Sequence, residues 1–121
     1  MNEPVVLVDA RNVLRSQWPN MPEDAVVELT CRWADDHGAQ AVVVFDGRAP
    51  ERSVPDRHRV VGTGEETADA WIERAAGDLR DRGRAYWLVT SDRGLRAAAA
   101  GAAERTIGGG AFARALRELP K

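Results

Sequence analysis

The chain has 121 residues, of which 44% are hydrophobic and 30% are charged, and its formal net charge is −2. This length and composition support one globular domain with a buried core over residues 1–121. No apolar run approaches the roughly 20 residues that span a bilayer, and the first residues lack the basic flank of a secretory signal. We therefore expect a cytoplasmic protein. Cys31 is the only cysteine, which excludes an internal disulfide and a cysteine-based zinc site.

The first third of the chain predicts two buried strands with one helix between them. Residues 5–8 and 41–45 are continuous, β-branched apolar runs, which are typical of strands buried on both faces. Residues 9–20 predict a loop. A helix should begin near residues 20–23, where a capping-type residue precedes a proline and acidic side chains, and it should end at His37.

The middle of the chain predicts a loop, a short strand and a second helix. Residues 46–57 combine glycine and prolines with charges, which indicates a loop. Residues 59–61 predict a short edge strand. Thr63 and Glu66 have the spacing of a capping box, so the helix that they open should run to about Arg82.

The last third repeats the alternation of strand and helix. Residues 86–90 predict a strand, and Ser91 can cap a helix that follows it. Residues 105–107 predict a last short strand, and a final helix follows the glycines at 108–110. This alternation indicates βαβ units and an α/β fold with a mostly parallel sheet. Right-handed crossovers then place all loops that follow strands at one edge of that sheet.

Four aspartates occupy positions that this topology brings together. Asp9, Asp46 and Asp92 follow the three longest strand-like runs, and Asp69 lies in the helix opened by the capping box. Carboxylates held close together repel each other and need a cation. Hard oxygen ligands of this kind favour Mg²⁺ or Mn²⁺. Such a site can hydrolyse a phosphodiester, because divalent ions activate water and relieve charge on the phosphate.

Each aspartate also has a structural explanation, because aspartate commonly caps helices or forms turns. Asp9 is an exception in this scheme, since the predicted loop separates it from the next helix. Glu66 is expected to be used in the capping box. Short polar residues lie near the acids and can orient a carboxylate, a metal-bound water or the scissile phosphate, namely Asn12, Thr67, Thr90 and Ser91. Local backbone capping is the competing explanation, and for Ser91 it is about equally good.

The densest basic stretch directly follows Asp46 and contains Arg48, Arg52, Arg57 and Arg59. At that position the four arginines would rim the acidic site and hold a phosphate backbone. A solvated arginine-rich loop explains them equally well. Trp18, in the predicted loop after Asp9, is a candidate for stacking on an unpaired base.

The chain resembles the YacP-like NYN-domain ribonucleases of the PIN-like nuclease superfamily. The resemblance extends from Val5 to about Leu116 and rests on four motifs: Asp9-x-x-Asn12, Phe45-Asp46, Gly64-Glu65-Glu66-Thr67-Ala68-Asp69 and Thr90-Ser91-Asp92. Family members often read Asp-Gly-Tyr-Asn at the first motif, where this chain has Ala10 and Arg11.

This resemblance implies a PIN-like three-layer sandwich and a Mg²⁺- or Mn²⁺-dependent endoribonuclease. The metal-binding acids would be Asp9, Asp46, Asp69 and Asp92, with Asn12 beside them. RNA would be the partner, including messenger RNA on the ribosome. The alternative is a non-catalytic RNA- or ribosome-binding module that keeps the fold but has no working metal site.

Overall fold

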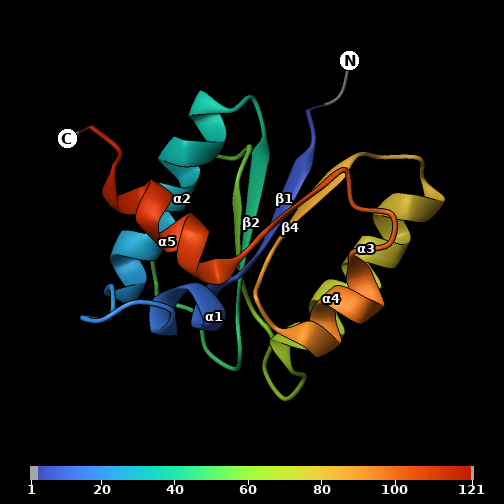
Figure 1. The fold of residues 1–121 in the computed structure, drawn as a ribbon, viewed down its shortest axis with the longest axis horizontal. Coiled ribbons are helices and arrows are strands. Elements are labelled where there is room, and N and C mark those ends of the chain that lie inside the picture. Colours follow the sequence, from blue (N-terminus) through green and yellow to red (C-terminus); the bar gives the residue numbers. More distant parts are fainter. Residues whose placement is uncertain (1–2, 121) are drawn as a thin grey trace.

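The fold consists of one parallel sheet between two layers of helices (Figure 1), in a computed structural model that describes residues 3–120. All neighbouring strands pair in parallel, in the order β3-β2-β1-β4-β5. The strands are β1 (Val5–Asp9), β2 (Gln40–Phe45), β3 (Arg59–Gly62), β4 (Tyr86–Val89) and β5 (Arg105–Ile107). The predicted parallel α/β fold is confirmed, and β3 is the edge strand that the sequence indicates.

The helices divide between the two faces of the sheet (Figure 1). One face is covered by α1 (Ala10–Arg15), α2 (Glu23–Asp36) and α5 (Gly109–Arg117), and the other by α3 (Ala68–Asp81) and α4 (Arg93–Ala99). This is the predicted three-layer arrangement. Over the residues described, no helix has the length and apolar character that crossing a membrane requires.

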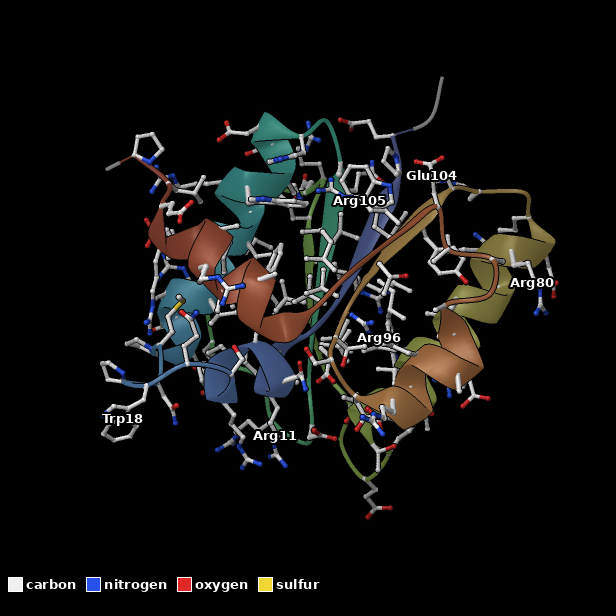
Figure 2. The ribbon with its side chains drawn as sticks, viewed as in Figure 1. Arg11, Trp18, Arg80, Arg96, Glu104 and Arg105 are labelled. Carbon is white, nitrogen blue, oxygen red and sulfur yellow. The ribbon has the colours of Figure 1, made fainter. Side chains whose placement is uncertain are left out.

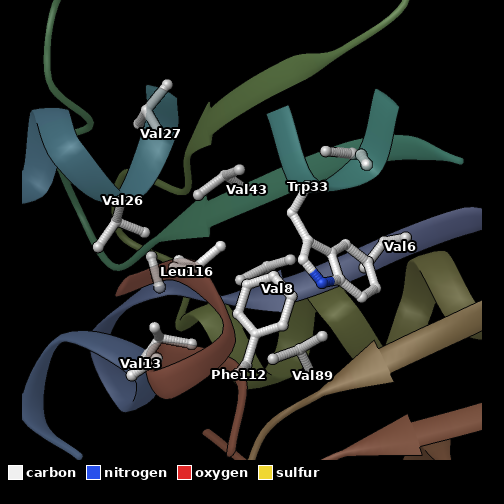
Figure 3. Packing of buried hydrophobic residues seen from close by; sticks show 14 of the residues in the cluster. Val6, Val8, Val13, Val26, Val27, Trp33, Val43, Val89, Phe112 and Leu116 are labelled. Atoms are coloured by element: carbon white, nitrogen blue, oxygen red, sulfur yellow. The ribbon is translucent and has the colours of Figure 1, made fainter. Parts of the chain in front are cut away.

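Two hydrophobic cores explain why the strand sequences are apolar without alternation. Val6 and Val8 of β1 face the core under α1, α2 and α5, whereas Val5 and Leu7 face the core under α3 and α4. Successive side chains of a strand point to opposite faces, so a strand covered on both sides must be apolar throughout. The first core is centred on aromatic side chains (Figure 3), with Trp33 of α2 at 5.0 Å from Phe112 between ring centroids.

The register of the sheet aligns the carboxyl ends of its central strands. Val8 of β1 lies opposite Val43 of β2 and Val89 of β4, so the residues that follow these positions emerge at one edge. The chain must return to the other edge before each new strand, because every strand runs in the same direction. Side chains at the strand ends therefore gather even where they are distant in sequence.

The predicted loop after Asp9 is wrong in its first half, because α1 begins directly at Ala10. Ala10 and Val13 are buried in the first core, and this packing stabilises a helix of only 6 residues. Asp9 thus occupies the N-cap position, although its side chain makes no capping hydrogen bond. The expected separation between Asp9 and the next helix therefore does not exist.

Two helix starts also differ from the sequence interpretation. Thr67, not Thr63, caps α3, since its hydroxyl accepts a hydrogen bond from the Ala70 N–H, and Glu66 pairs with Arg74 instead of closing a capping box. Asp92, not Ser91, caps α4. In each case the capping residue lies later in the chain than the residue that the sequence predicted.

Candidate functional site

A pocket of about 330 Å³ lies at the carboxyl edge of the sheet. Its lining consists of Asp9, Arg11, Asn12, Arg15, Asp46, Thr67, Asp69 and Asp92. We call this the acidic pocket. It brings together all four aspartates that the sequence singled out, together with Asn12. They come from β1, from the ends of β2 and β4, and from the first turn of α3.

Asp9 forms the buried base of the acidic pocket, with only 6% of its surface exposed. Burial raises the pKa of its carboxyl group, and the nearby carboxylates of Asp69 and Asp46 act in the same direction. The Thr90 hydroxyl opposes this shift by donating a hydrogen bond to Asp9 Oδ2 at 3.0 Å. Thr90 is held in turn by the Arg96 guanidinium, which donates to its carbonyl oxygen at 2.8 Å. Asp9 is therefore both buried and held in position through Thr90.

Asp46 connects the end of β2 to the start of α3. Its Oδ1 accepts a hydrogen bond from the Ala68 N–H at 2.7 Å, which satisfies one of the unpaired donors at that helix end. Its Oδ2 lies 3.6 Å from Nε of Arg11. One basic side chain thus already lies against the acidic pocket and offsets part of its negative charge.

Asp69 and Asp92 form the exposed rim of the acidic pocket. Asp92 Oδ1 accepts a hydrogen bond from the Leu95 N–H at 2.8 Å as the cap of α4. Asp69 has neither a hydrogen bond nor an ion pair from its side chain within residues 3–120. Desolvation raises the pKa of Asp69, and the carboxylates of Asp92 and Asp46 raise it further. Asp69 thus faces other acids without a compensating cation.

Asn12 and Ser91 form a connection between three segments at this edge. Oδ1 of Asn12 accepts a hydrogen bond from the Ser91 N–H at 2.9 Å, and Oγ of Ser91 accepts one from the Gly109 N–H at 2.8 Å. A Cβ atom at Gly109 would lie 2.0 Å from Asn12 Oδ1. These contacts fasten α1 and the β4–α4 loop to the start of α5. The role of Asn12 and Ser91 in orienting water or phosphate stays a prediction.

The basic segment does not rim the acidic pocket, and this expectation is wrong. Its arginines instead pair with acids elsewhere: Arg52 with Glu28 at 3.3 Å, and Arg57 with Glu3 at 2.7 Å and Asp35 at 3.2 Å. Arg59 lies over the ring of Trp71 at 5.5 Å, and Arg48 lines a separate hollow beside Glu23. For Arg57 and Arg59 the physical reason is the parallel sheet, since the chain must reach the opposite edge before β3 begins. Arg48 follows β2 directly but lies toward the start of α2.

Arg11 and Arg15 are the basic residues that do line the acidic pocket, and the sequence interpretation missed them. They are four residues apart and share one face of α1. Their spacing indicates a shared helix face only when the short helix α1 is known. Thr67 and Thr90 lie beside the acids as expected, although each also serves in local capping or bridging.

The donor set of the acidic pocket suits a hard divalent cation. Its candidate ligands are four carboxylates and one amide, which match the oxygen preference of Mg²⁺ and Mn²⁺. Over residues 3–120 no three acidic, histidine or cysteine side chains stand close enough together to hold an ion directly. An ion would therefore require small side-chain movements or intervening water, which Mg²⁺ commonly retains.

The fold and the acidic pocket define a parallel α/β sandwich domain with clustered acids at the carboxyl ends of its strands. The YacP-like NYN domain model matches residues 6–121, and the chain belongs to this family. Family membership places it among nuclease-like proteins with an RNA-related role. No curated protein matches the chain.

Two solved structures have the same fold. The crystal structure of Rae1 (YacP) from Bacillus subtilis shares 23% sequence identity and a TM-score of 0.72, with 97% of this chain and 74% of that chain covered. A mutant of the same protein gives 24% identity and a TM-score of 0.72, with 93% and 74% covered. The resemblance noted from the motifs is thereby confirmed at the level of family and fold.

The raised pKa values predict a stability change when Asp69 is replaced. A carboxyl group whose pKa is raised by folding contributes stability below its unfolded pKa, near 3.8, and loses it as the pH rises through the folded pKa. Asp69→Asn should therefore raise the melting temperature at neutral pH in EDTA. The difference should shrink at about pH 3.5, where the carboxyl group is largely protonated in both states. Calorimetric melting at both pH values measures it, and an unchanged or lower melting temperature at neutral pH would contradict the repulsion.

Proposed function

We propose that this protein is an endoribonuclease that depends on Mg²⁺ or Mn²⁺ and hydrolyses phosphodiester bonds of RNA. The observation that carries this proposal is the gathering of Asp9, Asp46, Asp69 and Asp92 in the acidic pocket. The acids come from separate elements, and besides burial the neighbouring carboxylates raise the pKa of Asp9 and of Asp69. Such an arrangement is unfavourable in a stable domain unless a cation offsets it.

The four aspartates would hold the ion, and each makes a different contribution. When bound, the ion would supply an activated water and neutralise charge on the phosphate. Asp9 provides a fixed ligand, because it is buried and held by Thr90. Asp46 and Asp92 are oriented by main-chain N–H groups. These bonds leave Oδ2 of Asp92 available, whereas Oδ2 of Asp46 would have to exchange its loose pairing with Arg11 for the ion. Asp69, without such a tie, can turn toward the ion.

Asn12 and Ser91 enter this proposal as positioning groups. Oδ1 of Asn12 accepts the Ser91 N–H, so the amide Nδ2 of Asn12 is the group that can donate a hydrogen bond to a phosphate or a water in the acidic pocket. The resemblance of the motifs extends the proposal to cytoplasmic messenger RNA engaged by ribosomes.

A non-catalytic RNA- or ribosome-binding module is the second candidate. It is favoured by the contacts that Asp46 and Asp92 already make with helix N–H groups and, for Asp46, with Arg11. It is also favoured because no set of three potential ligands is drawn together over residues 3–120.

Titration with Mn²⁺ separates the two candidates. The proposed ribonuclease should release or absorb heat on binding Mn²⁺ in a calorimeter, and it should cleave labelled single-stranded RNA with Mn²⁺ but not with EDTA. RNA binding without Mn²⁺ binding would favour the non-catalytic module. Absence of cleavage across RNAs of varied sequence, with Mn²⁺ and with Mg²⁺, would overturn the proposed activity.

A further inference from the structure

We propose that single-stranded RNA leaves the acidic pocket along α1, with its phosphates on Arg11 and Arg15 and an unpaired base stacked on Trp18. We call this the α1 track. It rests on the proposed ribonuclease function and adds to it the strand state of the substrate and the side chains that hold it. Figure 2 shows Arg11 and Trp18 projecting along one edge of the molecule, with α1 between them.

The two arginines give the track its affinity for phosphate. Both line the acidic pocket and both are exposed. Arg11 is only loosely paired, with its Nε 3.6 Å from Asp46 and half of its side chain exposed. Arg15 has no ion-pair partner within residues 3–120. On an α-helix, residues four apart lie about 6 Å from each other along the axis, so the two guanidinium groups can contact successive backbone positions.

Trp18 supplies an aromatic surface at the far end of α1. It is 88% exposed and is the only large hydrophobic side chain so exposed in the part of the chain that the structure describes. Single exposed apolar residues are common on proteins, but the backbone around this one is held in place. Arg117 of α5 donates to the Pro19 carbonyl oxygen, and Met21 is buried in the first core. The ring is thus displayed on an anchored segment.

The arrangement of Arg11, Arg15 and Trp18 favours single-stranded RNA over a protein as the partner of the α1 track. An apolar protein surface would need a contiguous hydrophobic patch, whereas Trp18 stands alone among polar and basic neighbours. Cations that follow a backbone, combined with an aromatic ring for a base, are the usual means of binding unpaired nucleic acid. A duplex keeps its bases stacked inside and cannot offer one to Trp18.

Anisotropy of a labelled single-stranded RNA of about 12 nucleotides, in EDTA and low salt, tests the α1 track. Trp18→Ala should weaken binding about tenfold, and Trp18→Phe should retain most of it, because phenylalanine still stacks. Arg15→Ala should weaken binding and lower the slope of log K against log salt by about 0.7. Arg80→Ala removes an exposed arginine at the far end of the molecule (Figure 2) and should leave binding unchanged.

A second measurement separates the α1 track from catalysis. In Mn²⁺, Trp18→Ala should raise KM for RNA cleavage with little change in kcat. Wild-type cleavage accompanied by unchanged affinity and KM in both Trp18→Ala and Arg15→Ala would overturn the track and leave the ribonuclease proposal standing. Weakened RNA binding in these variants without any cleavage by the wild type would support the track and overturn the activity. Absence of single-stranded RNA binding by the wild type would overturn the track. A loss of affinity for double-stranded RNA in Trp18→Ala as large as the loss for single-stranded RNA would also overturn it.

Discussion

Asp69→Asn is expected to reduce Mn²⁺-dependent RNA cleavage by about 100-fold or more, because it removes a carboxylate from the proposed metal site. Asp69 is the most informative position of the four. Its side chain makes no hydrogen bond or ion pair within residues 3–120, whereas those of Asp46, Asp92 and Asp9 also hold parts of the fold. A loss of cleavage in this variant therefore reports on chemistry and not on unfolding.

Asp81→Asn is the matched control for this experiment. Asp81 lies on the same helix, is exposed and, within residues 3–120, pairs through its side chain with Arg80 alone, so its replacement changes the net charge equally and lies outside the lining of the acidic pocket. Cleavage rates should be measured at saturating Mn²⁺ on the same RNA for both variants. Equal activity of Asp69→Asn and Asp81→Asn would contradict a role of Asp69 in catalysis.

Gly109→Ala is expected to destabilise the protein by about 2 kcal/mol, since overpacking costs about 1–3 kcal/mol and loss of an exposed hydrogen bond adds at most about 1 kcal/mol. The added Cβ would lie 2.0 Å from Asn12 Oδ1 and 3.2 Å from the Asn12 carbonyl oxygen. Asn12 would have to move, and its bond from the Ser91 N–H would be lost. Urea unfolding followed by circular dichroism measures the change.

The neighbouring glycine provides the control for this substitution. A Cβ at Gly110 would meet only Ser16 Cβ, at 3.9 Å, so Gly110→Ala introduces no clash. Alanine also favours helix over glycine by about 1 kcal/mol, and the variant should be neutral or slightly more stable. If both variants unfold at the same urea concentration, the close packing between α5 and Asn12 does not stabilise the fold.

The sequence predicted the sheet well because its signal is strong. Continuous apolar runs such as residues 41–45 are typical of strands buried on both faces, and the helices between them favour parallel pairing. The gathering of the aspartates followed from that topology alone. These inferences depend on periodicity and connectivity, which do not require knowledge of side-chain contacts.

Local details were less predictable, because competing residues of similar chemistry stand side by side. Thr63 and Thr67 both suit a helix start, and the outcome depends on Asp46, which binds the Ala68 N–H from a distant strand. The sequence does not reveal such a tertiary partner. The helix α1 was missed for the same reason, since 6 residues form a stable helix only when packed against α5.

The positions of Arg57 and Arg59 could have been predicted from the parallel topology itself. Arg57 lies just before β3 and Arg59 is its first residue, and this strand runs parallel to β2. They must therefore lie at the edge opposite to Asp46, although they follow it closely in sequence. Residues that are close to Asp46 in sequence are therefore not close to it in the fold.

The strand order has a consequence for the timing of any activity. β1 is made first but lies in the middle of the sheet, so its two neighbours pair with it only after much more of the chain has emerged. The acidic pocket needs both Asp9 and Asp92, one from the first strand and one from the turn after the fourth. The acidic pocket, and with it the activity proposed above, can therefore form only after the chain has been synthesised as far as α4.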